Sequence, residues 1–181
     1  MKRLLICTGL LAAATTLIAQ QGPPASPPQK VAATIGGTPV SISYSSPGVK
    51  GREGKIFTKD GLISHNPHYP VWRAGANSAT TLEAGGDLQI GNVTVPKGTY
   101  TLFVDISDPD NWVLIVNKKT GEWGLAYDST QDLGKVKMQM ATPPGGMVEN
   151  LKYTITDSGG GKGILTLAWE NHSASVPIST H

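Results

Sequence analysis

The sequence predicts an all-β fold, namely an antiparallel β-sandwich or flattened barrel of about ten short strands with one long irregular loop. Segments rich in β-branched residues alternate with Gly, Pro, Asn and Asp along most of the chain. No window shows a sustained helical period. The composition agrees, because 22 Gly and 13 Pro accompany only 15% charged residues among 181, and Gly and Pro favour turns over helix interiors.

The first element is a predicted secretory signal peptide over residues 1–19. Lys2 and Arg3 precede Leu4–Ile18, an uncharged apolar run that ends in small residues around Ala19. This run is shorter than the ~20 residues that a membrane-spanning helix needs. We therefore expect cleavage after Ala19 and a periplasmic or secreted product, with no transmembrane segment in the mature chain.

The charge balance after cleavage argues against a nucleic-acid partner. The whole sequence has 15 Lys and Arg against 13 Asp and Glu. Two of the basic residues belong to the signal peptide, so the mature chain is formally neutral, whereas nucleic-acid binding needs a clustered basic surplus. The single cysteine, Cys7, also lies in the signal peptide, which excludes a disulfide or a thiolate ligand from the mature chain.

Two segments follow the signal peptide. Residues 20–30 are rich in Pro and Gln and are predicted to form a flexible tether, and residues 31–181 are predicted to form one β-sandwich domain. The strands expected in this domain are Val31–Ile35, Val40–Tyr44, Ala79–Glu83, Asp87–Ile90, Tyr100–Ile106, Trp112–Asn117, Leu133–Met140, Leu151–Thr156, Ile164–Glu170 and Ala174–Ile178.

Alternation within these strands identifies core faces. Tyr100, Leu102 and Val104 share one face of their strand, and Leu165, Leu167 and Trp169 share one face of theirs. Gly36-Gly37 and Gly91-Asn92 fit tight hairpin turns. Asp108-Pro109-Asp110-Asn111 fits a polar turn between two apolar strands.

One stretch, Ser46–Ala76, breaks the pattern. It has weak periodicity but contains Arg52, His65, His68, Trp72 and Arg73. Loops longer than ~15 residues in compact domains are usually functional or disordered, and the aromatic content argues against disorder. We therefore expect this loop to form part of a site.

Several sequence blocks resemble the domain of unknown function 2911 family. They are Ser46–Arg52, Val71–Thr80, Pro96–Phe103, Trp112–Asn117, Trp123-Gly124 and Leu167–Glu170, and they occur in that order between about Val40 and Ile178. The resemblance implies an exported bacterial domain, mostly β, whose members have no assigned activity. The sequence departs from the family pattern at residues 65–70, where two histidines replace a compact turn.

The block around Trp72 suggests a ligand-binding site. Arg73 offers a rigid fork of donors for a carboxylate, phosphate or sugar hydroxyl, and Asn77 can both donate and accept hydrogen bonds. We expect a pocket where the long loop crosses a sheet edge, lined by Arg73, Asn77, Trp123 and Tyr127. The alternative interpretation is structural: Trp72 anchors the loop in the core, Arg73 pairs with Glu83 or Glu170, and Asn77 caps a turn.

His65 and His68 are the weak candidates for a metal site. Imidazoles at this spacing can bind zinc or copper, but two ligands do not make a site and Pro67 prevents the helix that would align them. We therefore expect neither a metal nor another cofactor, since no cofactor-binding motif occurs.

These observations favour an exported binding domain rather than an enzyme, with a small molecule, a glycan or an envelope protein as its partner. One alternative is a hydrolase or lyase acting on a polysaccharide, with Glu170 or Glu122 working alongside His68. Neither a Gly-x-Ser-x-Gly nor a His-Glu-x-x-His motif supports it. Another alternative is a structural partner in a cell-envelope complex.

Overall fold

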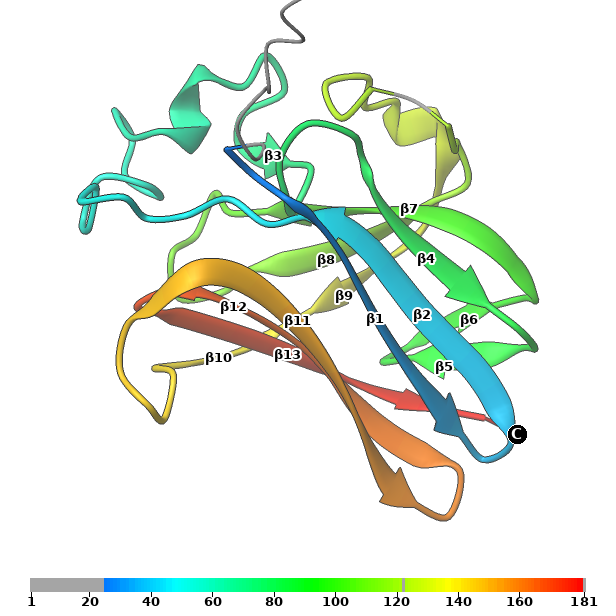
Figure 1. Ribbon diagram of the computed structural model, residues 1–181. Helices are drawn as coiled ribbons and strands as arrows, with labels where there is room; N and C mark the ends of the chain where they lie inside the picture. The colour runs from blue at the N-terminus through cyan, green and yellow to red at the C-terminus, as the bar shows by residue number, and fades with distance from the viewer. Residues whose placement is uncertain (1–24, 122, 181) are drawn as a thin grey trace, which may run out of the picture.

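Two antiparallel sheets face each other in the protein (Figure 1). The computed structural model describes residues 25–121 and 123–180. The two sheets are separate and do not close on each other, which confirms the predicted sandwich and excludes the barrel. The predicted signal peptide lies outside the described residues.

The first sheet has the order β1-β2-β4-β7-β8-β9, with β3 added beside β7. Its strands are β1 (Pro28–Ile35), β2 (Thr38–Ser45), β3 (Val71–Trp72), β4 (Thr80–Ala84), β7 (Gly98–Asp105), β8 (Val113–Asn117) and β9 (Asp132–Lys137). Two short 3-10 helices, Ile63–His65 and Ser129–Gln131, lie in the connections.

The second sheet has the order β11-β12-β13-β5-β6, with β10 added beside β13. Its strands are β5 (Leu88–Ile90), β6 (Val93–Val95), β10 (Gln139–Ala141), β11 (Val148–Gly159), β12 (Lys162–Glu170) and β13 (His172–Ser179). The predicted two-residue turns connect β1 to β2 and β5 to β6, with Ile35 opposite Thr38 and Ile90 opposite Val93.

The inner faces of the sheets form the core, as the alternation predicts. Tyr100, Leu102 and Val104 of β7 are buried. Leu165, Leu167 and Trp169 of β12 are buried as well. The outer face of β7 is also covered, because Phe103 packs edge-on against Tyr127 at 4.9 Å between ring centroids. This second contact explains why β7 is buried on both sides.

Some strand bounds differ from the prediction. The predicted Leu133–Met140 strand breaks at Met138, whose backbone N–H donates to the Trp112 carbonyl, and the chain then leaves the first sheet for the second. The short strands β3 and β6 were not predicted. β1 begins at Pro28 and pairs with β2 from that residue on, so residues 28–30 of the predicted tether are part of the sheet.

The long loop lies at the end of the sandwich away from the β1–β2 turn (Figure 1). Val49, Ile56 and Ile63 are buried and anchor it. Its beginning also bonds to β11, since the Val49 N–H donates to the Glu149 carbonyl at 2.8 Å. The loop is therefore an ordered wall of the domain.

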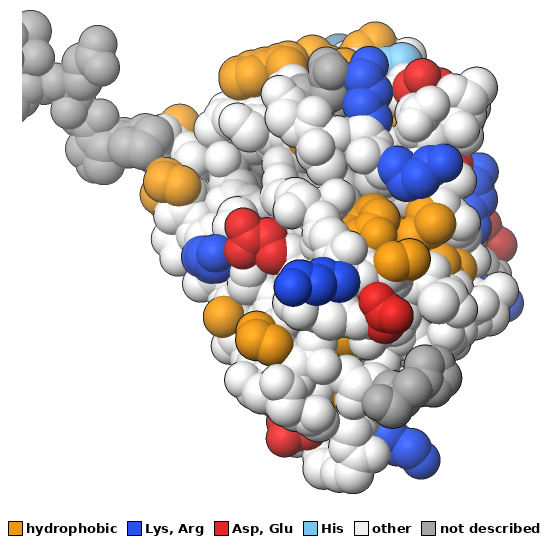
Figure 2. Space-filling model, turned by 90° about the vertical axis from the view of Figure 1, so that its right-hand side faces the viewer, with side chains coloured by type: hydrophobic (Ala, Val, Ile, Leu, Met, Phe, Trp, Pro, Cys, Tyr) orange, Lys and Arg blue, Asp and Glu red, His pale blue; other side chains and the backbone are white. Residues whose placement is uncertain are grey.

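The surface charges are dispersed on the face drawn in Figure 2, where basic and acidic side chains intersperse among uncharged polar atoms. This face carries no continuous basic patch. Within residues 25–121 and 123–180, no helix has the length and apolar character needed to cross a bilayer.

Candidate functional site

An aromatic cluster joins the long loop to both sheets. The indole rings of Trp72 on β3 and Trp169 on β12 stack at 5.8 Å between centroids with an interplanar angle of 24°. Phe57 from the loop packs edge-on against Trp72 at 5.7 Å and against Trp169 at 5.6 Å. The Trp72 Nε1–H donates to the Gly75 carbonyl at 3.1 Å, so this ring has no unsatisfied polar group. The cluster fixes the positions of the neighbouring loop segments.

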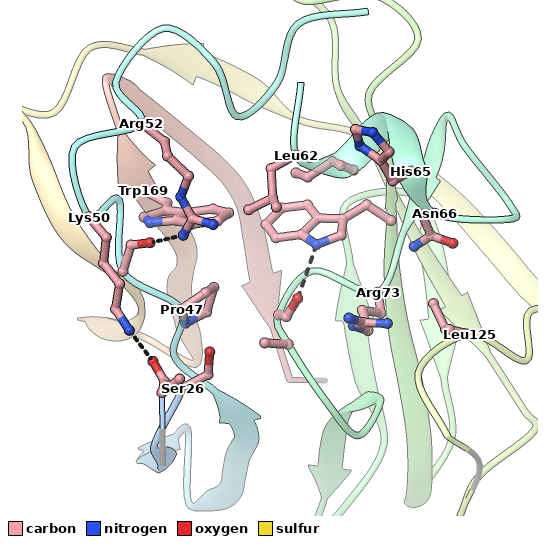
Figure 3. A pocket seen from close by; sticks show the side chains of 16 residues that line it. Ser26, Pro47, Lys50, Arg52, Leu62, His65, Asn66, Arg73, Leu125 and Trp169 are labelled. Carbon is pink, nitrogen blue, oxygen red and sulfur yellow. Dashed lines mark hydrogen bonds between the residues drawn. The ribbon is translucent and has the colours of Figure 1, made fainter. Parts of the chain in front are cut away.

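A cavity of about 460 Å³ lies beside Trp72 and Trp169 (Figure 3). We call it the Arg73 pocket. Arg52 and Trp169 lie on one side of it, and Arg73 with Asn66 and Leu125 lies on the other. Its other lining residues are Ala25, Ser26, Pro47, Gly48, Lys50, Leu62, Ile63, His65, Trp72, Gly75 and Ala76. The long loop thus supplies most of the wall, where it passes the end of the sandwich.

Arg73 is the residue lining this pocket whose buried side-chain nitrogens have unmet hydrogen-bonding capacity. Its Nε and Nη1 atoms are buried and have no hydrogen-bond partner among residues 25–121 and 123–180. Burial lowers the pKa of the Arg73 guanidinium below its ordinary value, although Arg remains protonated in proteins at neutral pH. A buried donor without a partner costs ~1–3 kcal/mol of stability. The structure thus leaves two donors of the Arg73 guanidinium unsatisfied among the described residues.

The two acids that the structural interpretation assigned to Arg73 are engaged elsewhere. Glu83 accepts hydrogen bonds from Lys30 Nζ at 2.9 Å and from Ser41 Oγ at 2.8 Å. Glu170 accepts one from the Gly54 N–H at 2.6 Å and lies beside His172. The pairing of Arg73 with Glu83 or Glu170 is therefore wrong.

Two further cations line the pocket and are held by backbone carbonyls. Arg52 donates from Nε to the Val49 carbonyl at 3.0 Å and from Nη2 to the Gly48 carbonyl at 2.7 Å. Lys50 Nζ donates to the Ala25 carbonyl at 3.1 Å. Among the described lining residues there is no Asp or Glu. The lining side chains are therefore net positive, which attracts anions, and the nearby Glu149 carboxylate accepts from the Lys50 backbone N–H at 2.9 Å.

Residues 26–178 match the model of a protein family described as "Protein of unknown function (DUF2911)". The chain belongs to the DUF2911 family. No curated protein and no solved structure matches it.

Several blocks through which the chain resembles the DUF2911 family meet at the Arg73 pocket. Ser46–Arg52 supplies Pro47, Gly48, Lys50 and Arg52, and Val71–Thr80 supplies Trp72, Arg73, Gly75 and Ala76. Leu167–Glu170 contributes Trp169. Gly124 lies against Arg73, because a Cβ placed on Gly124 would overlap Arg73 Cδ. Sequence blocks that are far apart in the chain thus converge on one cavity.

The structure places the four predicted ligand-binding residues differently. Arg73 lines the pocket, while Asn77, Trp123 and Tyr127 do not. Asn77 lies in the left-handed region at φ +56°, and its carbonyl accepts from the Gly124 N–H at 3.3 Å. Trp123 is 60% exposed. The Tyr127 hydroxyl donates to Asp132 Oδ2 at 2.8 Å.

Sequence reasoning missed Lys50 and Arg52 as residues of the same pocket. The available signal was their position in the irregular loop, within a block that carries the family resemblance. Their convergence with Arg73 depends on the path of the loop, which the Gly48–Asn150 bridge and the buried Val49 determine. Such long-range contacts are not visible in local sequence patterns.

The two candidate metal ligands, His65 and His68, contact different groups. His65 lines the Arg73 pocket, and its Nδ1 lies 3.0 Å from the Gly61 carbonyl. His68 packs edge-on against Tyr127 at 5.9 Å between centroids. No group of three or more His, Cys, Asp or Glu side chains with metal-binding geometry occurs in the described part of the chain.

The predicted acid–base residues are also separated. Glu170 contacts His172 rather than His68, because the turn between β12 and β13 brings the two together. Glu122 lies outside the described residues.

Proposed function

We propose that this DUF2911 protein is an exported binding domain that holds a small organic anion in the Arg73 pocket. The single observation that carries the proposal is the pair of buried Arg73 nitrogens that have no hydrogen-bond partner in the described part of the chain. A carboxylate or phosphate group on the ligand would accept from the Arg73 fork, which suits planar oxyanions. Arg52 and Lys50 add positive charge around the same cavity.

The walls of the pocket favour a ligand that also has an apolar or ring-shaped body. Trp72, Trp169, Leu62 and Leu125 line the cavity beside the cations. Ligand sites typically have volumes of ~300–1,000 Å³ and combine apolar walls with a few polar groups. The cavity of about 460 Å³ lies in the range for a small metabolite. The ligand class proposed is therefore a small carboxylate or phosphate attached to an apolar or cyclic group.

The proposed export of the protein rests on the residues before the folded domain. Lys2 and Arg3 followed by the apolar Leu4–Ile18 run have the organisation of a signal peptide. A cysteine-free mature chain also suits an oxidising compartment, because it has no thiol to oxidise.

Tryptophan fluorescence tests the binding function directly. Two of the four tryptophans line the pocket, so a bound anion should change their emission. A Trp123→Phe background removes the exposed indole. This background and two variants of it, Arg73→Met and Lys137→Met, are titrated with phosphate, citrate, benzoate and glucuronate. Lys137→Met is the control, because it also removes a cation, but one that lies on β9.

The proposal expects a saturable change with at least one anion, which Arg73→Met abolishes and Lys137→Met leaves intact. A response that both variants retain would place the binding elsewhere. Absence of any response to the four anions would oppose the proposed ligand class.

A further inference from the structure

A second cavity of about 460 Å³ lies next to the aromatic cluster and is chemically different from the Arg73 pocket. Phe57, Tyr69 and Trp112 form its aromatic walls, and Glu170 and His172 are its acid–base groups. The remaining lining side chains that can ionise are Lys59 and Tyr69. We call this the His172 cavity.

Glu170 occupies an unusual position for a carboxylate. Its side chain is only 3% exposed, and its backbone lies in the left-handed region at φ +55°. Residues 170 and 171 form the two-residue turn between Trp169 and His172, where positive φ favours glycine or asparagine. Backbone strain in a non-glycine residue persists where the surroundings hold it, and it is concentrated at functional sites.

The contacts of Glu170 hold the carboxylate against His172. Oε1 accepts from the Gly54 N–H at 2.6 Å. Oε2 lies 3.3 Å from His172 Nδ1. Among the described residues, His172 is the basic side chain within ion-pair distance of Glu170. The carboxylate is therefore oriented by the loop backbone and faces one imidazole nitrogen.

The imidazole of His172 is held on its other sides by aromatic rings. It stacks on Trp112 at 5.3 Å with an interplanar angle of 10° and packs against Phe57 at 4.6 Å. Nδ1 is buried and has no aligned hydrogen bond to any residue that the structure describes, yet the side chain is 30% exposed. The exposed surface therefore belongs to other atoms of the side chain, and His172 lines the cavity.

We propose that Glu170 and His172 form an acid–base pair that serves the His172 cavity, independently of anion binding at Arg73. The carboxylate keeps the proton of neutral His172 on Nδ1, which leaves a lone pair on Nε2. Nε2 then takes the proton of a ligand hydroxyl. An N–H bond forms, the O–H bond breaks, and its electron pair stays on the ligand oxygen.

The cavity fits a neutral, hydroxyl-bearing ring such as a sugar or a phenol. Aromatic walls provide flat apolar surface for a ring, and Thr58 and Ser107 add hydroxyl groups at the lining. In this pair His172 is the group that exchanges the proton, and Glu170 is a positioning residue.

The tautomer of His172 provides the first test. Long-range ¹H–¹⁵N NMR spectra, recorded at alkaline pH, distinguish a proton on Nδ1 from one on Nε2. The proposal expects the proton on Nδ1 and none on Nε2. A wild-type His172 with a proton on Nε2 would overturn it.

Glu170→Gln tests the positioning role with little change in shape. The amide oxygen can still accept from the Gly54 N–H, while its NH₂ group donates toward Nδ1 and should move the ring proton to Nε2. Glu53→Gln is the matched control, because Glu53 Oε1 accepts from Asn171 Nδ2 at 3.0 Å in the same turn without touching His172. The tautomer should invert in Glu170→Gln alone, and an unchanged tautomer in that variant would contradict the pairing.

Reactivity toward diethyl pyrocarbonate, a small neutral electrophile, tests whether Nε2 is accessible from the cavity. Peptide mass spectrometry monitors the modification of His172, with His65 of the same chain as the reference. The reaction of His172 should be fast in the wild type and in Glu53→Gln. It should be several-fold slower in Glu170→Gln. It should not change in Arg73→Met, which separates this site from anion binding. A His172 that does not react in the wild type, or that reacts equally in Glu170→Gln, would overturn the proposal even if Glu170→Gln were too unstable for NMR.

Discussion

Trp72 and Trp169 stack at 5.8 Å across the two sheets of the sandwich. Trp72 lies on β3 of the first sheet and Trp169 on β12 of the second, and both line the Arg73 pocket. The stack therefore closes one end of the core and forms a wall of the site. The pair therefore links the packing of the core to the shape of the Arg73 pocket.

Truncation of the stack should be strongly destabilising. Trp169→Ala removes a ring that is 2% exposed and should lower the free energy of unfolding by ~3–5 kcal/mol, because the cavity left behind is only partly filled. Trp123→Ala, at an exposed position, is the control and should change it by no more than about 0.5 kcal/mol. Urea denaturation measures both, and equal costs for the two variants would contradict the packing described.

Gly124→Ala should disturb both the fold and the site. The added Cβ would overlap Arg73 Cδ and lie 2.7 Å from the Asn77 carbonyl oxygen, so the guanidinium must move. We expect a lower melting temperature and weaker anion binding, measured by thermal unfolding and by fluorescence titration. Gly145→Ala is the matched control, since a Cβ there has no neighbour within 4 Å. A fully functional Gly124→Ala protein would show that Arg73 does not depend on this contact.

Alkaline pH should destabilise the protein through two tyrosines. Burial raises the pKa of Tyr127 above its ordinary value of 10, and the hydrogen bond to Asp132 raises it further. Burial likewise raises the pKa of Tyr153. The unfolded chain therefore loses these protons first, so the stabilisation is complete below about pH 10 and is lost as the pH rises above it. The urea midpoint should fall above about pH 10 in the wild type and fall less in a Tyr127→Phe, Tyr153→Phe double variant. Parallel pH profiles for the two proteins would contradict this cause.

Export predicts a defined mature N-terminus. When the full chain is expressed with a functional secretion system, we expect the exported protein to begin at Gln20, because the small residues around Ala19 suit signal-peptide cleavage. Intact-mass spectrometry of the extracytoplasmic fraction measures this directly. Retention in the cytoplasm with Met1 present would refute the signal peptide.

The strands were predictable where local pattern and burial agree. Alternation in β7 and β12 identified the core faces correctly, since Leu102 and Leu167 point into the space between the sheets. β3 was not predictable, because its two residues are strand-like only through pairing with Val104 and Asp105 of β7. The break at Met138 depends on a hydrogen bond to the distant Trp112 carbonyl.

The candidate site was predictable only in part for the same reason. Arg73 stood out because a cation next to a buried Trp in an irregular loop is chemically conspicuous. Its neighbour Arg52 reaches the pocket through the folded path of the loop, and Tyr127 is directed away by its bond to Asp132. Glu170 and His172 are two residues apart in the sequence, but this spacing alone does not predict a contact. The tight turn between β12 and β13 brings the two side chains together.

The stability of Arg73→Met without added ligand tests the central claim most directly. Methionine keeps the apolar stem beside Gly124 and removes the unpaired guanidinium. If Arg73 is held for an external anion, its removal should leave the free energy of unfolding unchanged or raise it by about 1 kcal/mol, because a buried donor without a partner is lost. A loss of ~3 kcal/mol or more, the cost of breaking a buried ion pair, would mean that Arg73 has a structural partner and would contradict the binding site.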